Sequence, residues 1–94
     1  MKKAYKVTYS DSDSDYDIAY FSDKETADIY AKEQVKHDIY GKWFEKEDID
    51  VQEVIEKHAS TFVVRRKNNE TGYLFSIDVY EIKIHNNAIS ASIG

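Results

Sequence analysis

The chain has 94 residues, 41% of them hydrophobic, and a formal net charge of −5. This length allows one domain with a modest core, and no apolar run approaches the roughly 20 residues of a transmembrane helix. The two lysines near the start precede no apolar stretch, so we expect no secretory signal. The absence of cysteine excludes disulfides and thiolate metal sites and is typical of a reducing compartment, so we expect a cytoplasmic protein.

Charge is distributed unevenly along the chain. Residues 1–58 hold fifteen Asp or Glu against nine Lys, whereas residues 59–94 hold three acids against four Lys or Arg. Binding to a phosphate backbone requires clustered cations, which the acidic part lacks. The charge distribution therefore favours a protein partner with a basic surface over a nucleic acid.

Two strands are predicted at the start of the chain. Residues 4–9 alternate, with the odd-numbered residues on one face, and residues 16–21 alternate with Tyr16, Ile18 and Tyr20 opposite Asp17. The Ser/Asp run between them suits a hairpin loop, because these side chains bond nearby backbone groups.

A helix is predicted over residues 23–37. Ser22 or Asp23 caps it, and we expect it to end between His37 and Gly41 or to continue to Phe44. The four-residue spacing of Asp28 and Lys32 predicts an ion pair on its surface. The stripe expected to face the core consists of Ala27, Tyr30, Ala31, Gln34 and Val35.

The second half of the chain is predicted to form three strands. Residues 48–58 fit either a strand or a short helix, and we favour the strand. Residues 61–66 and 73–84 then form an antiparallel hairpin around a turn at 67–72.

One feature of the last strand is a change of parity. Its apolar residues occupy odd positions up to Val79 and even positions from Tyr80 onward. Because strand alternation has a period of two, this change predicts a β-bulge or a sharp twist near Val79 and Tyr80. The alternative is a strand that is buried on both faces near its middle.

These elements predict an α+β fold with the order ββαβββ. We expect residues 1–84 to form one domain, with a mostly antiparallel sheet of about five strands and one main helix packed on one face. Residues 85–94 are small, polar and weakly patterned, and they are expected to form a flexible tail. An open edge next to residues 61–67 or 73–84 is expected to allow pairing with a second copy, giving a homodimer.

The acidic run at Asp11, Asp13 and Asp15 resembles the start of a calcium-binding EF-hand loop. Such a loop needs glycine at its sixth position and glutamate at its twelfth, where this chain has Tyr16 and Ser22. A specific EF-hand is therefore excluded, and weak binding of a metal or small ligand at this loop stays an alternative.

Motifs for catalysis are missing from the sequence. The serines lie in no Gly-x-Ser-x-Gly motif, and three scattered glycines form no phosphate-binding loop. His37, His58 and His85 lie far apart along the chain and show no zinc-ligand spacing. We therefore expect no enzymatic activity, no cofactor and no metal site.

A nucleic-acid-binding sheet is one alternative function. Arg65, Arg66 and Lys67 form a small basic cluster, and aromatic residues on predicted strands are able to stack on bases. The aromatic residues in question are Tyr5, Tyr9, Phe62, Tyr73 and Phe75.

A non-enzymatic module that binds another protein is the favoured function. Residues 11–56 contain fifteen acids against five lysines, a surface suited to a basic partner. Trp43 and Phe44 form an aromatic pair that is either an exposed anchor or a lid on the core. The candidate partner-binding residues are Asp11, Asp13, Asp15, Trp43, Phe44, Glu45, Glu47 and Asp48.

The opening segments YKVTYS (5–10) and IAYFSDKETADIYAKE (18–33) give the chain a resemblance in style to small accessory proteins of phages and mobile elements. Anti-CRISPR and anti-restriction inhibitors are among these proteins, and many of them are acidic binders. The resemblance includes no diagnostic motif, so it assigns no functional residue. It implies a host defence or nucleic-acid-handling protein as the target, which the inhibitor would block by occlusion.

Overall fold

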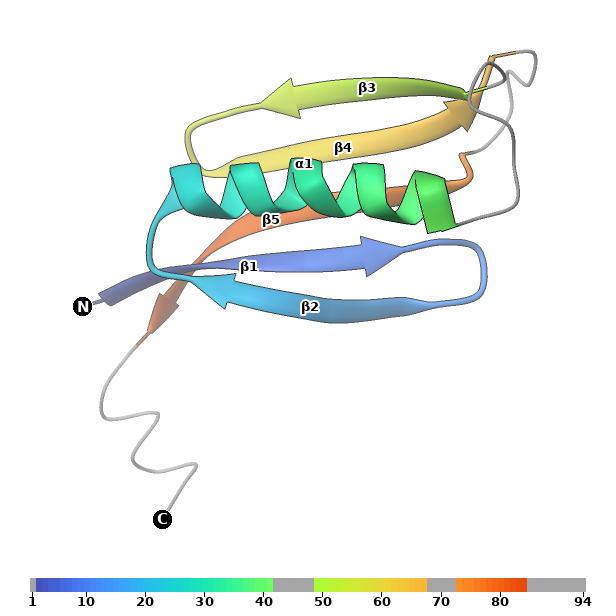
Figure 1. Cartoon of the computed structure of the whole chain (residues 1–94). Helices are drawn as coiled ribbons and strands as arrows, with labels where there is room; N and C mark the ends of the chain where they lie inside the picture. Colours follow the sequence, from blue (N-terminus) through green and yellow to red (C-terminus); the bar gives the residue numbers. More distant parts are fainter. Residues whose placement is uncertain (1, 42–48, 68–72, 85–94) are drawn as a thin grey trace.

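The computed structural model describes residues 2–41, 49–67 and 73–84. The strands form one antiparallel sheet in the order β2-β1-β5-β4-β3, so the last strand of the sequence lies at its centre (Figure 1). This arrangement confirms the predicted α+β fold with five strands and one helix packed on the sheet. No helix in these ranges has the length and apolar character needed to cross a membrane. The elements are β1 (Lys2–Ser10), β2 (Asp15–Phe21), α1 (Lys24–Gly41), β3 (Ile49–Ile55), β4 (Ala59–Arg66) and β5 (Phe75–Ile84).

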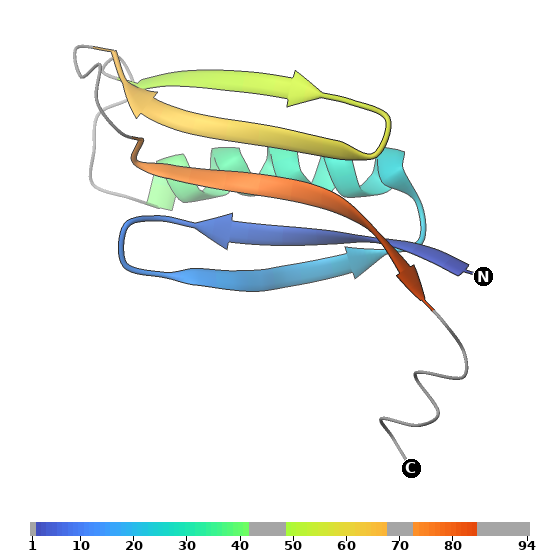
Figure 2. The same cartoon turned by 180° about the vertical axis from the view of Figure 1, so that it is seen from behind.

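The two faces of the sheet differ in what covers them. α1 lies across one face, packed mainly against β5, β1 and β4 (Figure 1). Viewed from behind, the other face has no described element in front of it (Figure 2). We call this surface the open face, and strand register places on it Lys6, Thr8, Ser10, Asp15, Asp17, Tyr20, Thr61, Val63, Ser76, Asp78 and Tyr80.

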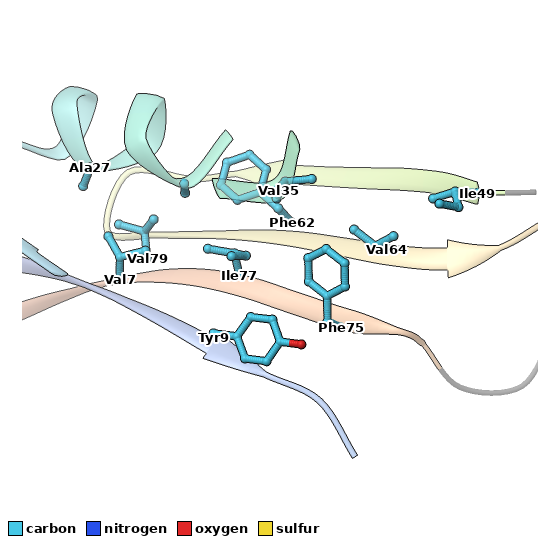
Figure 3. Close-up of a cluster of buried hydrophobic side chains, with 11 residues drawn as sticks. Val7, Tyr9, Ala27, Val35, Ile49, Phe62, Val64, Phe75, Ile77 and Val79 are labelled. Carbon is cyan, nitrogen blue, oxygen red and sulfur yellow. The ribbon is translucent and has the colours of Figure 1, made fainter. Parts of the chain in front are cut away.

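The core lies between α1 and the sheet. Every second residue of β1, β4 and β5 points toward the helix, which matches the alternation of apolar residues in the sequence. Ala27 and Ala31 are fully buried on the helix, and their small side chains allow it to lie close to the sheet (Figure 3). The strand residues in this cluster are Val7, Tyr9, Ile49, Phe62, Val64, Phe75, Ile77 and Val79.

The start of α1 confirms one of the two predicted caps. The Asp23 carboxylate accepts hydrogen bonds from the Thr26 backbone N–H at 2.9 Å and from the Thr26 hydroxyl at 2.8 Å. These bonds stabilise the ionised carboxylate and lower the pKa of Asp23. The predicted ion pair of Asp28 with Lys32 is wrong: Asp28 instead contacts Lys24, one turn earlier, at 2.8 Å. Ser60 attracts Lys24 to this position by accepting a second hydrogen bond, which a sequence pattern within the helix does not reveal.

The end of α1 at Gly41 falls within the predicted range. The alternative end at Phe44 lies outside the described residues, as do most of the turn predicted at 67–72 and the predicted tail at 85–94.

The strand β2 departs from the predicted alternation. Its register with β1 shifts between Val7 and Thr8, so that Ile18 is an extra residue on β2. The expectation that Tyr16, Ile18 and Tyr20 share a face is therefore wrong. Tyr16 stacks on Tyr9 on the helix side, with ring centroids 5.1 Å apart, whereas Tyr20 lies on the open face.

The strand β5 lacks the predicted bulge. Its register with β1 is continuous from Ser76 to Ile84, so the expected bulge at Val79 and Tyr80 is wrong. The alternative is confirmed, because residues 75–79 are buried on both faces apart from the half-buried Asp78. A strand that is covered on both faces need not alternate strictly between apolar and polar residues. β5 curves toward its C-terminal end (Figure 2).

The strand predicted for residues 48–58 is confirmed as β3, which pairs with β4 in regular antiparallel register. The expected position of the open edges is wrong. β4 and β5 each have a neighbouring strand on both sides, and the outer strands are β2 and β3. Strand order depends on contacts between distant segments, which local patterns do not encode.

Candidate functional site

The open face brings together acidic and tyrosine side chains from β2 and β5, the two strands on either side of β1. In the first row, Lys6 on β1 lies between Tyr20 on β2 and Tyr80 on β5. In the second row, Thr8 lies between Asp17 and Asp78, and in the third row Asp15 lies opposite Ser10. We call the group of Asp15, Asp17, Tyr20, Asp78 and Tyr80, with Lys6 among them, the acid–tyrosine patch.

Hydrogen bonds hold the side chains of this patch. The Tyr20 hydroxyl donates to Asp17 Oδ2 at 2.6 Å, while Lys6 Nζ lies 3.9 Å from Asp17 Oδ1. The Ser76 hydroxyl donates to Asp78 Oδ2 at 3.2 Å. The two tyrosines nevertheless remain open to solvent, with 57% of Tyr20 and 44% of Tyr80 exposed.

The surrounding charges affect both phenols of the patch. The hydrogen bond to Asp17 raises the pKa of Tyr20, because losing the phenolic proton would place two negative charges together. Burial is the main cause that raises the pKa of Tyr80, and the negative charges of Asp78 and Asp15 add to it. Both phenols therefore remain protonated at neutral pH.

The patch has the chemistry to recognise cationic groups. It combines three carboxylates, which accept hydrogen bonds from lysine or arginine, with only one lysine of its own. The exposed side chains of Tyr20 and Tyr80 add aromatic surface on which an ammonium or guanidinium group can stack.

The structure separates the three aspartates of the first predicted site. Asp11 Oδ1 accepts the backbone N–H groups of Asp13 and Ser14, both at 2.8 Å, and Asp11 Oδ2 accepts the Tyr9 hydroxyl at 2.7 Å. Asp11 thus stabilises the hairpin turn. Burial is the main cause that raises the pKa of Tyr9, and the hydrogen bond from its hydroxyl to Asp11 adds to it. Asp13 lies exposed at the turn, and only Asp15 joins the acid–tyrosine patch.

The other predicted partner-binding residues are an aromatic pair and three acids. Trp43, Phe44, Glu45, Glu47 and Asp48 lie outside the described residues.

The basic cluster is split by strand geometry. Arg65 and Arg66 are consecutive on β4, so their side chains point to opposite faces, and Lys67 follows the end of the strand. The predicted stacking residues Tyr9, Phe62 and Phe75 are buried beneath α1, on the face opposite Arg65. Tyr5 is half-buried, and of the five aromatic residues only Tyr73 is largely exposed.

Two of the three histidines lie at separate places. His37 is near the end of α1 beside Asp38, and His58 lies in the β3–β4 turn, where its Nδ1 contacts Glu81 Oε2. Lys3 Nζ approaches the other oxygen of Glu81 at 3.4 Å, and the hydrogen bond from His58 is the main cause that lowers the pKa of Glu81. His85 lies outside the described ranges, and within them no three His, Cys, Asp or Glu side chains form a group suited to a metal.

Sequence reasoning missed four residues of the patch: Asp17, Tyr20, Asp78 and Tyr80. The alternation of polar with apolar residues along β5 could have indicated that Asp78 lies on the face opposite the core. Its proximity to the residues of β2, however, depends on the strand order.

No protein-family model, curated protein or solved structure matches this chain.

Proposed function

We propose that this protein is a non-enzymatic binding module whose open face docks on a basic surface of another protein. The observation that carries the proposal is the acid–tyrosine patch, which lies where no described element covers the sheet (Figure 2). Exposed tyrosines are frequent anchors in protein interfaces, and surrounding carboxylates select cationic partners.

The distribution of aromatic residues supports a protein partner over a nucleic acid. A base-stacking sheet needs aromatic side chains and cations on one exposed face. Here the open face carries Asp15, Asp17 and Asp78, which would repel phosphates, and three of the predicted stacking residues are buried on the other face.

The resemblance to phage accessory proteins suggests a more specific form of the proposal. In this form the partner is a host defence or nucleic-acid-handling protein, and the acid–tyrosine patch covers the basic channel through which that partner holds its nucleic acid. Carboxylates that take the place of phosphates are a physical route to such occlusion.

An affinity experiment with three baits tests the proposal. The full chain, the double variant Asp15→Asn/Asp17→Asn and the control Asp13→Asn/Glu25→Gln are each immobilised and exposed to an extract of the cells that express the gene. Both variants remove two exposed negative charges, but only the first alters the patch. We expect a protein retained by the full chain and the control, bound about tenfold more weakly by the patch variant, and released by salt.

Two results would contradict the proposal. Recovery of RNA or DNA without a protein would favour the nucleic-acid alternative. Equal retention of the same protein by both variants would show that the acid–tyrosine patch is not the binding surface.

A further inference from the structure

The strand β3 is an outer strand of the sheet, and no other described strand pairs with its outer side. Val51, Val54 and Ile55 are 38%, 45% and 50% exposed, so apolar side chains project from both faces of this strand. Its register is regular over all seven residues, without a bulge. The opposite outer strand, β2, carries a bulge at Ile18, a feature that discourages pairing with another strand.

The backbone groups of β3 that have no partner strand within residues 2–41, 49–67 and 73–84 can be assigned from the hairpin. The Glu56 N–H donates to the Ala59 carbonyl at 2.9 Å, so Glu56 bonds toward β4. Because residues of an antiparallel strand bond alternately to either side, Val54, Gln52 and Asp50 also bond toward β4. The remaining residues present their N–H and C=O groups outward, and these are Ile49, Val51, Glu53 and Ile55.

A groove follows this outer strand. It has a volume of about 270 Å³ and lies between α1 and β3, because α1 packs over the inner strands. Val35, Ile39 and Phe62 supply apolar surface to it. Lys32 and Lys36 line it from the helix, and Val51 and Glu53 line it from the strand.

We propose that β3 pairs antiparallel with β3 of a second copy, so that the two five-stranded sheets join into one continuous sheet. The register that uses the whole strand places a two-fold axis at Gln52. Val51 of each copy then lies opposite Glu53 of the other, and Ile49 lies opposite Ile55. These are the residues whose N–H and C=O groups point outward, so each free group finds a partner.

The placement of charges supports a second copy as the occupant. In this register Asp50 lies opposite Val54 and Glu53 lies opposite Val51, so no carboxylate directly faces another. A shift that placed Glu53 opposite Glu53 would lose this advantage. Glu53 of the second copy also reaches the side of the sheet on which Lys32 and Lys36 line the groove.

The pairing has a structural consequence. A two-fold axis perpendicular to the sheet keeps both helices on one side and joins the two open faces on the other. The inference does not depend on the proposed function, since the acid–tyrosine patch lies on β1, β2 and β5, away from this edge.

Sedimentation of the full chain and three variants tests the pairing. The wild type should reach twice 11.0 kDa as its concentration rises over roughly 5 µM to 0.5 mM. Glu53→Pro removes an outward N–H without removing a bond to β4, and it should give a monomer. Ile55→Lys places charges at the proposed contact and should weaken the dimer at least tenfold, whereas the control Ile29→Lys should not, although Ile29 on α1 is similarly exposed at 56%.

Amide hydrogen exchange gives a second measurement if Glu53→Pro fails to fold. The outward amides of Val51, Glu53 and Ile55 should become protected only as the wild-type concentration rises, while those of Gln52 and Val54 should be protected throughout. Three results would overturn the proposal: a wild type that stays monomeric, a dimer that survives Ile55→Lys, or outward amides whose protection does not depend on concentration. The last result would mean that this chain covers its own edge.

Discussion

The two faces of the sheet differ in chemistry although they share the same strands. Beneath α1 the residues of β1, β4 and β5 are mostly apolar and almost fully buried, as Val7, Phe62 and Val79 illustrate. On the open face many of the intervening residues are hydroxyls, carboxylates and tyrosines, such as Thr8, Asp17 and Tyr80. The difference indicates that the helix-covered face supplies most of the stability, which leaves the open face free for recognition.

The largest expected effect on the free energy of unfolding is at Val64, and its neighbour Val63 on β4 provides the comparison. Val64 is fully buried beneath α1, and Val63 is half-buried on the open face. Val64→Ala should lower the free energy of unfolding by about 2–3 kcal/mol, because it removes buried apolar surface and leaves a cavity. Val63→Ala should lower it by less than about 1 kcal/mol. Urea unfolding at one fixed chain concentration measures both, and equal losses would refute the proposed division between the faces.

The next effect concerns a polar contact at the helix-covered face. Lys24 Nζ lies 2.8 Å from both Asp28 Oδ2 and Ser60 Oγ, and the side chains of Lys24 and Asp28 are only 16% and 15% exposed. Asp28 Oδ1 is buried and has no hydrogen-bond partner among the described residues. Lys24→Met should therefore lower the free energy of unfolding by about 1–2 kcal/mol, because it leaves the Asp28 carboxylate unpaired.

The double variant Lys24→Met/Asp28→Leu is the control for this contact. Replacing both partners removes the unpaired charge, so urea unfolding should show recovery of part of the lost stability. Additive losses in the double variant would mean that Lys24 and Asp28 do not stabilise each other.

The smallest expected effect on stability is at Glu81, near one end of the sheet. Contacts with His58 and Lys3 lower the pKa of Glu81 below its ordinary value of 4.5. A carboxyl with a lowered folded-state pKa stabilises the fold above its ordinary pKa, and this contribution is lost as the pH falls through the folded-state value. Glu81→Gln should therefore be slightly less stable than the wild type near pH 6 and equal to it in strong acid.

Urea midpoints at a series of pH values measure this dependence. Glu33→Gln is a suitable control, because the ion pair of Glu33 with Lys36 is exposed on both sides and contributes little. A wild type and a Glu81→Gln variant that differ by the same amount at every pH would show that the Glu81 charge has no part in stability.

Several elements were predictable because their determinants are local. Asp23 caps the helix through Thr26, three residues away, and the strands β1 and β4 follow the alternation of Val7, Phe62 and Val64. The candidate site was predictable only in its acidic character. Asp15 was identified in advance, but its neighbours Asp17 and Asp78 come from β2 and β5, and only the strand order brings these together.

The sequence alone determined the class of the elements other than β3 and the buried side of the inner strands β1 and β4, because the periods of helices and strands are local properties of the chain. Tertiary structure decided that β5 is central, that Ile18 is accommodated in a bulge and that β3 is left with an open edge. These features depend on which distant segments pair, and pairing is chosen by the packing of the whole core rather than by neighbouring residues.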